Sequence, residues 1–302
     1  YTNTHRAFLQ VLLSRQCLTY AEAKPLISTI ETASNPARPT LPEDVSQEDF
    51  TNYIDALNTA ISPFDLEIRS TRHQVTRERV WALVNTSSDA LTQMSTTFSA
   101  EEMGFVKRVL DAMFDTNNTR EKEVMAVSST QALRLCKPGA ANADERRRDS
   151  GNDEVMQAMA KDNGVTMSQA ERVLELLVEQ GWFELSGRGY YSLSPRTLME
   201  LRGWLVDTYN EPADENDDED DDDEGERQLI KFCAACREIV TVGQRCPDLD
   251  CNARAHDHCV RNLFRAQGGR EQCPVCKVAW RDALPVGESA AKCGRRTTNG
   301  SR

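Results

Sequence analysis

One stretch of the chain, residues 232–280, decides the fold of its C-terminal part: FCAACREIVTVGQRCPDLDCNARAHDHCVRNLFRAQGGREQCPVCKVAW. Its seven cysteines and one of its two histidines follow the spacing Cys-x2-Cys-x9-Cys-x4-Cys-x4-His-x2-Cys-x13-Cys-x2-Cys. Thiolate and imidazole ligands at such spacing are typical of structural zinc sites, which take four protein ligands each. The stretch therefore predicts two closed tetrahedral sites holding two Zn²⁺ ions. The predicted ligands are Cys233, Cys236, Cys246, Cys251, His256, Cys259, Cys273 and Cys276.

A disulfide framework is the alternative explanation for these cysteines. Disulfides require an oxidising compartment, and residues 1–15 lack the apolar core of a signal peptide. The His-x2-Cys spacing of His256 and Cys259 also favours metal chelation. It matches the Cys-x2-Cys spacing, so His256 is a better candidate ligand than His258. About fifty residues bury little apolar area. Metal binding must therefore supply much of the folding free energy, on the order of 10–16 kcal/mol for a structural zinc.

The negative charge of the chain is concentrated in one segment. The chain has 302 residues and a formal net charge of −12, and residues 211–226 hold twelve Asp or Glu and no Lys or Arg. Like charges at this density resist compaction, so we predict a disordered acidic linker over 210–228. Mimicry of nucleic acid or binding of a basic partner is the functional alternative. No stretch approaches about 18 apolar residues, so no membrane span is expected.

Residues 4–88 have the pattern of a small helical domain that ends in a hairpin. Apolar residues recur at helical spacing in two segments within 4–33, and a third helix is predicted over 47–61. Alternating apolar residues between 66 and 84 predict two strands of a β-hairpin. Three helices followed by a hairpin is the order of a winged-helix domain.

The same pattern returns in residues 99–208. Ser99 with Glu102 and Ser168 with Glu171 have the spacing of capping boxes that open helices. In chain order we predict a helix from Ser99, a helix over 127–135, a mobile loop over 137–152, a short helix over 153–161, a helix from Ser168 to Gly181, a hairpin turning at 186–189 and a last helix from Ser194.

The predicted fold class is mostly α with small β-hairpins: tandem winged-helix domains followed by a cross-braced two-zinc domain. The predicted parts are winged-helix domains over 4–88 and 99–208, the acidic linker over 210–228, the zinc domain over 229–284 and a flexible tail over 285–302.

The helices that would read DNA in these modules are acidic. Their charged residues are Glu48, Asp49 and Asp55 in the first module, and Glu171, Glu175 and Glu179 against Arg172 in the second. Such helices repel phosphate, so we predict that they pack against protein. The first hairpin, in contrast, is basic, and a non-specific DNA contact or a solvated strand face both explain it. Its basic residues are Arg69, Arg72, His73, Arg77 and Arg79.

Two zinc folds share this ligand order, the RING finger and the PHD finger. In either cross-brace the first and third ligand pairs hold one zinc, and the second and fourth pairs hold the other. PHD fingers usually place an aromatic residue two positions before the seventh ligand, where this chain has Glu271. The closing run from Cys273 to Cys276, with Pro274 inside it, is typical of RING fingers. We therefore favour a RING variant over a PHD-type chromatin reader.

The whole arrangement resembles the non-SMC element 1 subunit of the SMC five/six chromosome-maintenance complex. The resemblance covers nearly all of residues 4–281, and its specific part is the run from Phe232 to Trp280. It implies a nuclear subunit that acts in DNA repair and as a RING-type ubiquitin ligase. It also implies three partners: a MAGE-like winged-helix subunit, a kleisin subunit and a ubiquitin-conjugating enzyme. Acidic recognition helices are consistent with it, since the winged helices of that family assemble with protein partners.

Resemblance to active RING fingers also implies which residues contact the conjugating enzyme and ubiquitin. They are Ala235, Leu263, Phe264 and Pro274 for the enzyme and Lys277 for the clamp on ubiquitin. Ala235 is smaller than the aliphatic residue usual at that position, so activity is expected to depend on the partner subunit. The alternative is a non-catalytic, zinc-stabilised interaction scaffold, in which Leu263, Phe264 and Trp280 face a neighbouring subunit.

Overall fold

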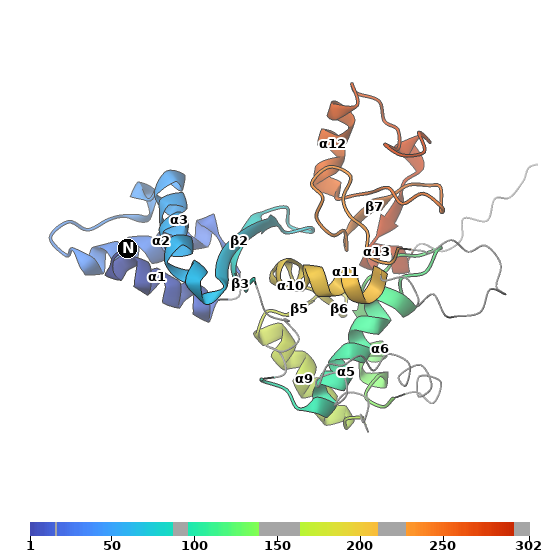
Figure 1. The fold of residues 1–302 in the computed structure, drawn as a ribbon, viewed down its shortest axis with the longest axis horizontal. Helices are drawn as coiled ribbons and strands as arrows, with labels where there is room; N and C mark the ends of the chain where they lie inside the picture. The colour runs from blue at the N-terminus through green and yellow to red at the C-terminus, as the bar shows by residue number, and fades with distance from the viewer. Residues whose placement is uncertain (16, 87–95, 139–163, 211–227, 293–302) are drawn as a thin grey trace, which may run out of the picture. The chain divides into compact units, whose positions relative to one another are not determined.

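Three short antiparallel sheets and the helices around them make up the structure, a computed structural model (Figure 1). It describes residues 1–15, 17–86, 96–138, 164–210 and 228–292. The chain divides into two units, described separately below: Tyr1–Ser99, Arg172–Glu184 and Leu193–Arg202 in the first, and Ala100–Glu171, Leu185–Ser192 and Gly203–Arg302 in the second. No helix within the described ranges is long and apolar enough to cross a membrane.

Some predicted features fall outside the described residues. These are the acidic linker apart from its ends, nearly all of the loop over 137–152, the short helix over 153–161 and the tail from residue 293 onward.

The first winged-helix module has the three helices and the hairpin that the sequence predicts. Its elements are α1 (Asn3–Ser14), β1 (Leu18–Thr19), α2 (Tyr20–Ser34), the 3-10 turns Pro42–Asp44 and Ser62–Phe64, α3 (Gln47–Ile61), β2 (Leu66–Arg72) and β3 (Arg79–Asn85). The sheet has the order β1-β3-β2, with all pairs antiparallel. Helix α3 begins where Ser46 accepts a hydrogen bond from the backbone N–H of Asp49.

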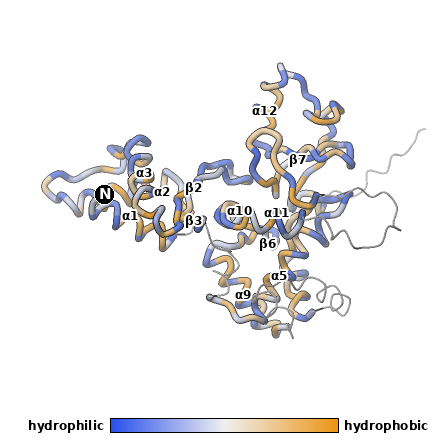
Figure 2. The backbone as a smooth tube through the Cα atoms, in the orientation of Figure 1, coloured by the Kyte–Doolittle hydropathy of each residue, from blue (hydrophilic) through white to orange (hydrophobic). Residues whose placement is uncertain are grey.

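Apolar side chains from the helices and the hairpin form the core of this module. Phe8, Leu57 and Phe50 are at most 1% exposed, and Phe50 meets the Trp81 ring edge-on at 4.9 Å. Burying one such side chain contributes roughly 1.5–3 kcal/mol. Hydrophobic and hydrophilic residues alternate along the helices (Figure 2), as expected for helices with one buried face.

The second module repeats this order. Its elements are α5 (Ala100–Asp111), a π-helical turn (Ala112–Thr116), β4 (Val127–Ser128), α6 (Ser129–Arg134), α9 (Met167–Glu179), β5 (Phe183–Leu185), β6 (Tyr190–Leu193), α10 (Pro195–Glu200) and α11 (Arg202–Asn210). Its sheet order, β4-β6-β5, matches β1-β3-β2 element for element, with a two-residue strand at one edge and the last hairpin strand in the centre.

The start of α9 corrects one prediction. Ser168 and Glu171 do not open this helix; the cap lies two residues earlier. The backbone N–H and hydroxyl of Thr166 donate to the Gln169 side chain at 2.9 and 2.8 Å, and the Gln169 N–H donates to the Thr166 hydroxyl at 3.3 Å. Two overlapping sequences with capping-box spacing compete here.

The last predicted helix of the second module is broken in two. Ser194 caps α10, accepting a bond from the Thr197 N–H as its sequence predicts. However, α10 ends at Glu200, and α11 starts at Arg202 after the buried Leu201.

The metal-ligand stretch folds around a third sheet. It is built from β7 (Gly243–Arg245), β8 (Arg254–Ala255) and β9 (Leu284–Val286) in the order β8-β7-β9, with α12 (Asp257–Ala266) after β8, the 3-10 turn Trp280–Asp282 and the short α13 (Glu288–Ala291).

The expectation of a flexible tail from residue 285 is wrong for its first part. Strand β9 pairs with β7, with Pro285 opposite Gln244. Ala290 of α13 packs against Val124 and Ala126. These contacts are tertiary, so the polar composition of the tail did not reveal them.

The two ends of the acidic segment are held together. The Asn210 side chain donates to the Ile230 carbonyl and accepts from the Ile230 N–H, both at 2.8 Å. Nearby, the Asn118 side chain donates to the Leu229 carbonyl at 2.8 Å. Residues 228–292 are called the metal-ligand domain below. This domain therefore packs directly against the part of the second module in its own unit, and the acidic segment is not its only attachment.

We therefore expect the stability of the second unit to depend little on the length of the acidic segment. Replacing residues 212–227 by a short Gly-Ser linker should change the free energy of unfolding by less than ~1 kcal/mol, since each doubling of loop length costs only about 0.6 kcal/mol. Asn210→Ala should cost more, ~1–2 kcal/mol, because it removes two hydrogen bonds. Urea unfolding of the three proteins measures both effects. A large loss from the linker replacement with none from Asn210→Ala would contradict this view.

Candidate metal centres

The eight predicted ligands come together as two separate groups of four. Within each group the ligand atoms all lie within 4.8 Å of one another. The first tetrad joins the first and third ligand pairs, Cys233, Cys236, His256 and Cys259; the second joins Cys246, Cys251, Cys273 and Cys276. This interleaving is the cross-brace that the sequence predicts.

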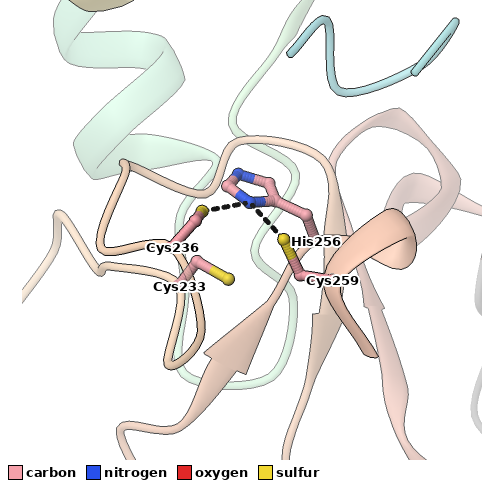
Figure 3. Close-up of side chains that lie close together, drawn as sticks. All are labelled: Cys233, Cys236, His256 and Cys259. Carbon is pink, nitrogen blue, oxygen red and sulfur yellow. Dashed lines mark hydrogen bonds between the residues drawn. The ribbon is translucent and has the colours of Figure 1, made fainter. Parts of the chain in front are cut away.

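In the first tetrad the four side chains point toward a common centre (Figure 3). His256 Nδ1 lies 3.3 Å from Cys236 Sγ and 3.9 Å from Cys259 Sγ. The other ring nitrogen, Nε2, lies 3.1 Å from the Ile239 carbonyl oxygen. A carbonyl only accepts, so we assign the proton to Nε2, which leaves the lone pair of Nδ1 facing the tetrad. The rival His258 stacks on the His256 ring at 5.0 Å and belongs to neither tetrad.

In the second tetrad the sulfur atoms are close but not bonded. Cys246 Sγ and Cys276 Sγ are 3.4 Å apart, and Cys251 Sγ and Cys273 Sγ are 3.5 Å apart. A disulfide needs ~2.05 Å, whereas a tetrahedron with ~2.3 Å zinc–sulfur bonds has edges of ~3.8 Å. Burial raises the pKa of the Cys246 and Cys251 thiols. Their ionisation therefore requires a compensating cation.

Both tetrads fit zinc by the chemistry of their donors. One offers three sulfur atoms and one imidazole nitrogen, and the other offers four sulfur atoms. Soft ligands in groups of four select a tetrahedral metal such as zinc. A bound metal in either tetrad would supply folding free energy and would have no open position for a substrate.

The two Cys-x2-Cys turns have the same backbone design. In each, the first cysteine donates its N–H to the carbonyl five residues on, and the residue four positions on donates back to that cysteine. The bonds are Cys233 to Glu238 (2.8 Å), Arg237 to Cys233 (2.9 Å), Cys273 to Val278 (2.8 Å) and Lys277 to Cys273 (3.2 Å). Arg237 and Lys277 both have a φ of 65°, in the left-handed region that most residues avoid. The shared geometry makes Arg237 a natural control for Lys277.

A buried charged cluster next to the tetrads was not foreseen from the sequence. Glu123, which is fully buried, accepts two hydrogen bonds from Arg254 at 2.6 Å each and one from Lys231 Nζ at 2.7 Å. Arg245 Nη1 lies 3.4 Å from the same carboxylate. The three cations are between 1% and 4% exposed. The only sequence signal was a basic residue close to each ligand pair, which reads more simply as solvated charge.

The residues implied as conjugating-enzyme contacts differ in exposure. Ala235 and Lys277 are exposed, and Phe264 and Pro274 are half-buried. Lys277 Nζ donates to the Pro274 carbonyl at 2.6 Å. Leu263 is only 6% exposed and belongs to the core, and its contact with the conjugating enzyme stays a prediction.

The Trp280 side chain, which the scaffold alternative expects to face a neighbouring subunit, is also in the core. Trp280 is 3% exposed; its indole N–H donates to the Gln244 side chain at 2.9 Å, and its ring meets Phe264 edge-on at 6.4 Å. The Trp280 indole is held within the domain by these contacts.

The basic first hairpin makes contacts of its own within the first unit. Arg69 pairs with Glu67 at 2.7 Å, and the Arg79 guanidinium lies 5.7 Å from the centre of the Trp81 ring. Neither contact tests DNA binding, so a non-specific DNA contact through this hairpin stays a prediction.

Tandem winged-helix modules followed by a cross-braced domain with two Cys/His tetrads define the class of this protein as a winged-helix protein with a RING-like domain. The family described as "Nse1 non-SMC component of SMC5-6 complex" matches residues 5–201, and the family described as "RING-like domain" matches residues 233–276. The chain belongs to the Nse1 family of SMC5-6 complex components. A RING-like rather than a PHD-type domain is thereby confirmed.

Relatives agree along nearly the whole chain at low identity. The human "Non-structural maintenance of chromosomes element 1 homolog" is 22% identical over 284 residues, covering 94% of this chain and 86% of the relative. The homolog of the same name from Xenopus tropicalis is 20% identical over 283 residues, covering 93% and 84%. A solved chain of an "Nse1-Nse3-Nse4 complex" has a TM-score of 0.65 at 17% identity and covers 94% of this chain and 99% of that one. That likeness shows a shared fold.

Gly243 gives a direct test of the packing around the first tetrad. A Cβ at this position would lie 2.4 Å from the Ala255 carbonyl oxygen and 3.1 Å from the His256 Cα. Gly243→Ala should therefore destabilise the metal-ligand domain by ~1–3 kcal/mol. The matched change Gly203→Ala, in α11 with nothing within 4 Å of the new Cβ, should be neutral or stabilising by ~0.5–1 kcal/mol. Urea titration with metal release as the readout compares them, and equal stability of the two variants would contradict the packing argument.

Proposed function

We propose that this protein is a RING-type ubiquitin–protein ligase subunit of a nuclear SMC5-6 complex, acting in DNA repair and chromosome maintenance. In this proposal each tetrad binds one structural Zn²⁺. The protein forms no covalent intermediate with ubiquitin; it holds a conjugating enzyme and its ubiquitin thioester in a reactive pose. Correct orientation alone can remove several kcal/mol from a barrier of this kind.

The observation that carries the proposal is the exposure of the second Cys-x2-Cys turn, Cys273–Cys276. The two turns, Cys233–Cys236 and Cys273–Cys276, are called the first and second knuckles below. Val275 is 65% exposed although it is apolar, and it lies between two ligands of the second tetrad. Next to it, Lys277 is exposed, and its bond to the Pro274 carbonyl holds the ammonium close to the knuckle. An apolar tip beside a cation suits a surface that grips a conjugating enzyme and its charged ubiquitin.

Dependence on a partner follows from the small apolar area of the surface that would contact the conjugating enzyme. Ala235 offers little apolar area, and the Leu263 side chain is buried. Weak intrinsic affinity for the conjugating enzyme is the consequence, since binding energy scales with apolar area removed from water. The solved relative is titled as part of an Nse1-Nse3-Nse4 complex. We infer that a MAGE-like winged-helix subunit and a kleisin subunit are the partners of this chain, and that the first of them raises its activity.

A non-catalytic scaffold is the second candidate function. It is favoured by the direct packing of the metal-ligand domain in its unit, which gives a rigid surface. A rigid docking surface within the complex would need this packing and no ligase chemistry.

Ubiquitin discharge from a loaded conjugating enzyme separates the two candidates. The full chain is assayed with and without its MAGE-like partner, and zinc content is measured in the same samples. For the ligase we expect discharge that the partner stimulates and that His256→Ala abolishes, because this change removes a ligand of the first tetrad. No discharge with several conjugating enzymes, at two zinc ions per chain, would leave the scaffold as the better account.

Lys277 is the residue to test within the ligase proposal. Lys277→Ala should lower the discharge rate about tenfold, which corresponds to about 1.4 kcal/mol, and should leave the zinc content unchanged. Arg237→Ala makes the same change at the same backbone position of the other knuckle and should keep the wild-type rate. Equal rates for both variants would remove Lys277 from the mechanism.

A further inference from the structure

Glu123 lies far from the metal ligands in sequence but at the centre of the segments that carry them. Its backbone is tied to the end of the metal-ligand domain, because the Gly287 N–H donates to the Glu123 carbonyl at 2.8 Å. Its side chain forms the cluster with Lys231, Arg245 and Arg254. The residue thus joins the second module to several parts of the metal-ligand domain.

Each of the three cations lies within two residues of a metal ligand in the sequence. Lys231 precedes Cys233 by two residues, and Arg245 comes directly before Cys246. Arg254 lies between ligands of different tetrads, and its guanidinium also donates to the Cys251 carbonyl at 2.7 Å. One carboxylate therefore fixes three ligand-bearing segments, and these segments serve both tetrads.

Arg254 ties the cluster to the first knuckle as well. Its carbonyl accepts the N–H of Ala234, which lies between the first two ligands, at 2.8 Å. A shift of Arg254 would therefore move ligands on both sides of it. Arg245 adds a similar link, donating to the carbonyls of Arg120 and Leu249 at 2.9 and 3.2 Å.

The charges of the cluster and of loaded tetrads are complementary. Three cations around one carboxylate leave an excess of two positive charges in a buried place. With Zn²⁺ bound, a tetrad of three thiolates and one histidine carries one negative charge, and a tetrad of four thiolates carries two. Charges buried at low dielectric need such partners. Metal loss would remove the net negative charge of the tetrads from the surroundings of these cations.

The charge state of Glu123 agrees with this role. Burial on its own would raise the pKa of the carboxyl, but the hydrogen bonds and charge of Arg254 and the charges of the other two cations outweigh burial. Together they lower the pKa of Glu123 to about 2. The carboxylate is therefore ionised throughout the range in which the thiolates can hold a metal.

We propose that Glu123, which ligates no metal, is the positioning residue of both metal centres and couples metal retention to the packing of the metal-ligand domain on the second module. The coupling rests on metal binding by the two tetrads, which is part of the proposed function, and does not require ubiquitin transfer. Loss of the carboxylate therefore weakens metal retention, and loss of metal weakens the packing of the domain on the second module.

The test compares Glu123→Gln with Glu121→Gln in the full chain. Glutamine keeps the shape of Glu123 and removes its charge, and Glu121 is an exposed carboxylate two residues away. A chromogenic chelator is added in excess, and zinc release is followed with time. We expect Glu123→Gln to release zinc about tenfold faster than the wild type or more, since it removes the buried charge that the three cations share, and Glu121→Gln to match the wild type. Equal release from all three proteins would overturn the proposal.

Two further readouts distinguish positioning from a general loss of stability. The Co²⁺-substituted Glu123→Gln protein should keep its thiolate-to-metal absorption bands, showing that the ligand set is intact before the challenge. In the wild type, chelation should increase hydrogen exchange in residues 117–126, which carry no ligand, and should leave the helices α1 to α3 of the first unit unchanged. Unchanged exchange in 117–126 after complete metal removal would also overturn the proposal.

A second variant covers the case in which Glu123→Gln does not fold. Lys231→Met removes one cation and leaves both hydrogen bonds between Arg254 and Glu123 in place. Zinc release should then be several-fold faster, and a wild-type rate would count against the coupling. Zinc content at the start separates the proposed zinc binding from the proposed role of Glu123. Wild-type protein without zinc would contradict zinc binding by the tetrads. Zinc-loaded proteins with equal release rates would contradict only the role of Glu123.

Discussion

The grouping of eight Cys and His side chains into two tetrads suited to bind metal is the constraint on which the C-terminal part of the structure depends. Its strands are two or three residues long, and two of its most deeply buried side chains, Arg245 and Arg254, are charged. A core of this kind gains little from apolar burial, and buried charges oppose folding unless they are balanced. A metal bound in each tetrad would meet both needs, since it would cross-link the segments and leave a net negative charge on the thiolates.

The first unit folds by a different principle. Phe8, Phe50, Leu57 and Ile68 bring three helices and a hairpin together through apolar contact. The caps of α2 and α3 satisfy the helix ends with local side chains. No metal is required for such a core, so metal removal acts on one unit and spares the other.

The sequence predicted the features that are set by local chemistry. Ligand spacing predicted both tetrads, and apolar periodicity predicted α3 from its first residue to its last. It failed where a longer-range contact decides. Glu123 stands in the charged run from Glu121, which reads as a solvated loop until three cations from another segment surround it. Strand β9 exists because β7 offers it a pairing edge, and the burial of Leu263 follows from the packing of α12.

Direct packing of the metal-ligand domain changes how the acidic segment is understood. A domain held only by a charged linker would sample many orientations, and a ligase would then have to restrict them when it binds. Here the Asn210–Ile230 contact and the Glu123 cluster hold the domain on the part of the second module in its own unit. The orientation is therefore fixed before any partner arrives. Under the proposed ligase function, a partner would have to add contact area beside the small Ala235 and the exposed turn at Cys273–Cys276, rather than order. Partner dependence of this origin would act on the affinity for the conjugating enzyme and would leave the geometry of the two tetrads unchanged.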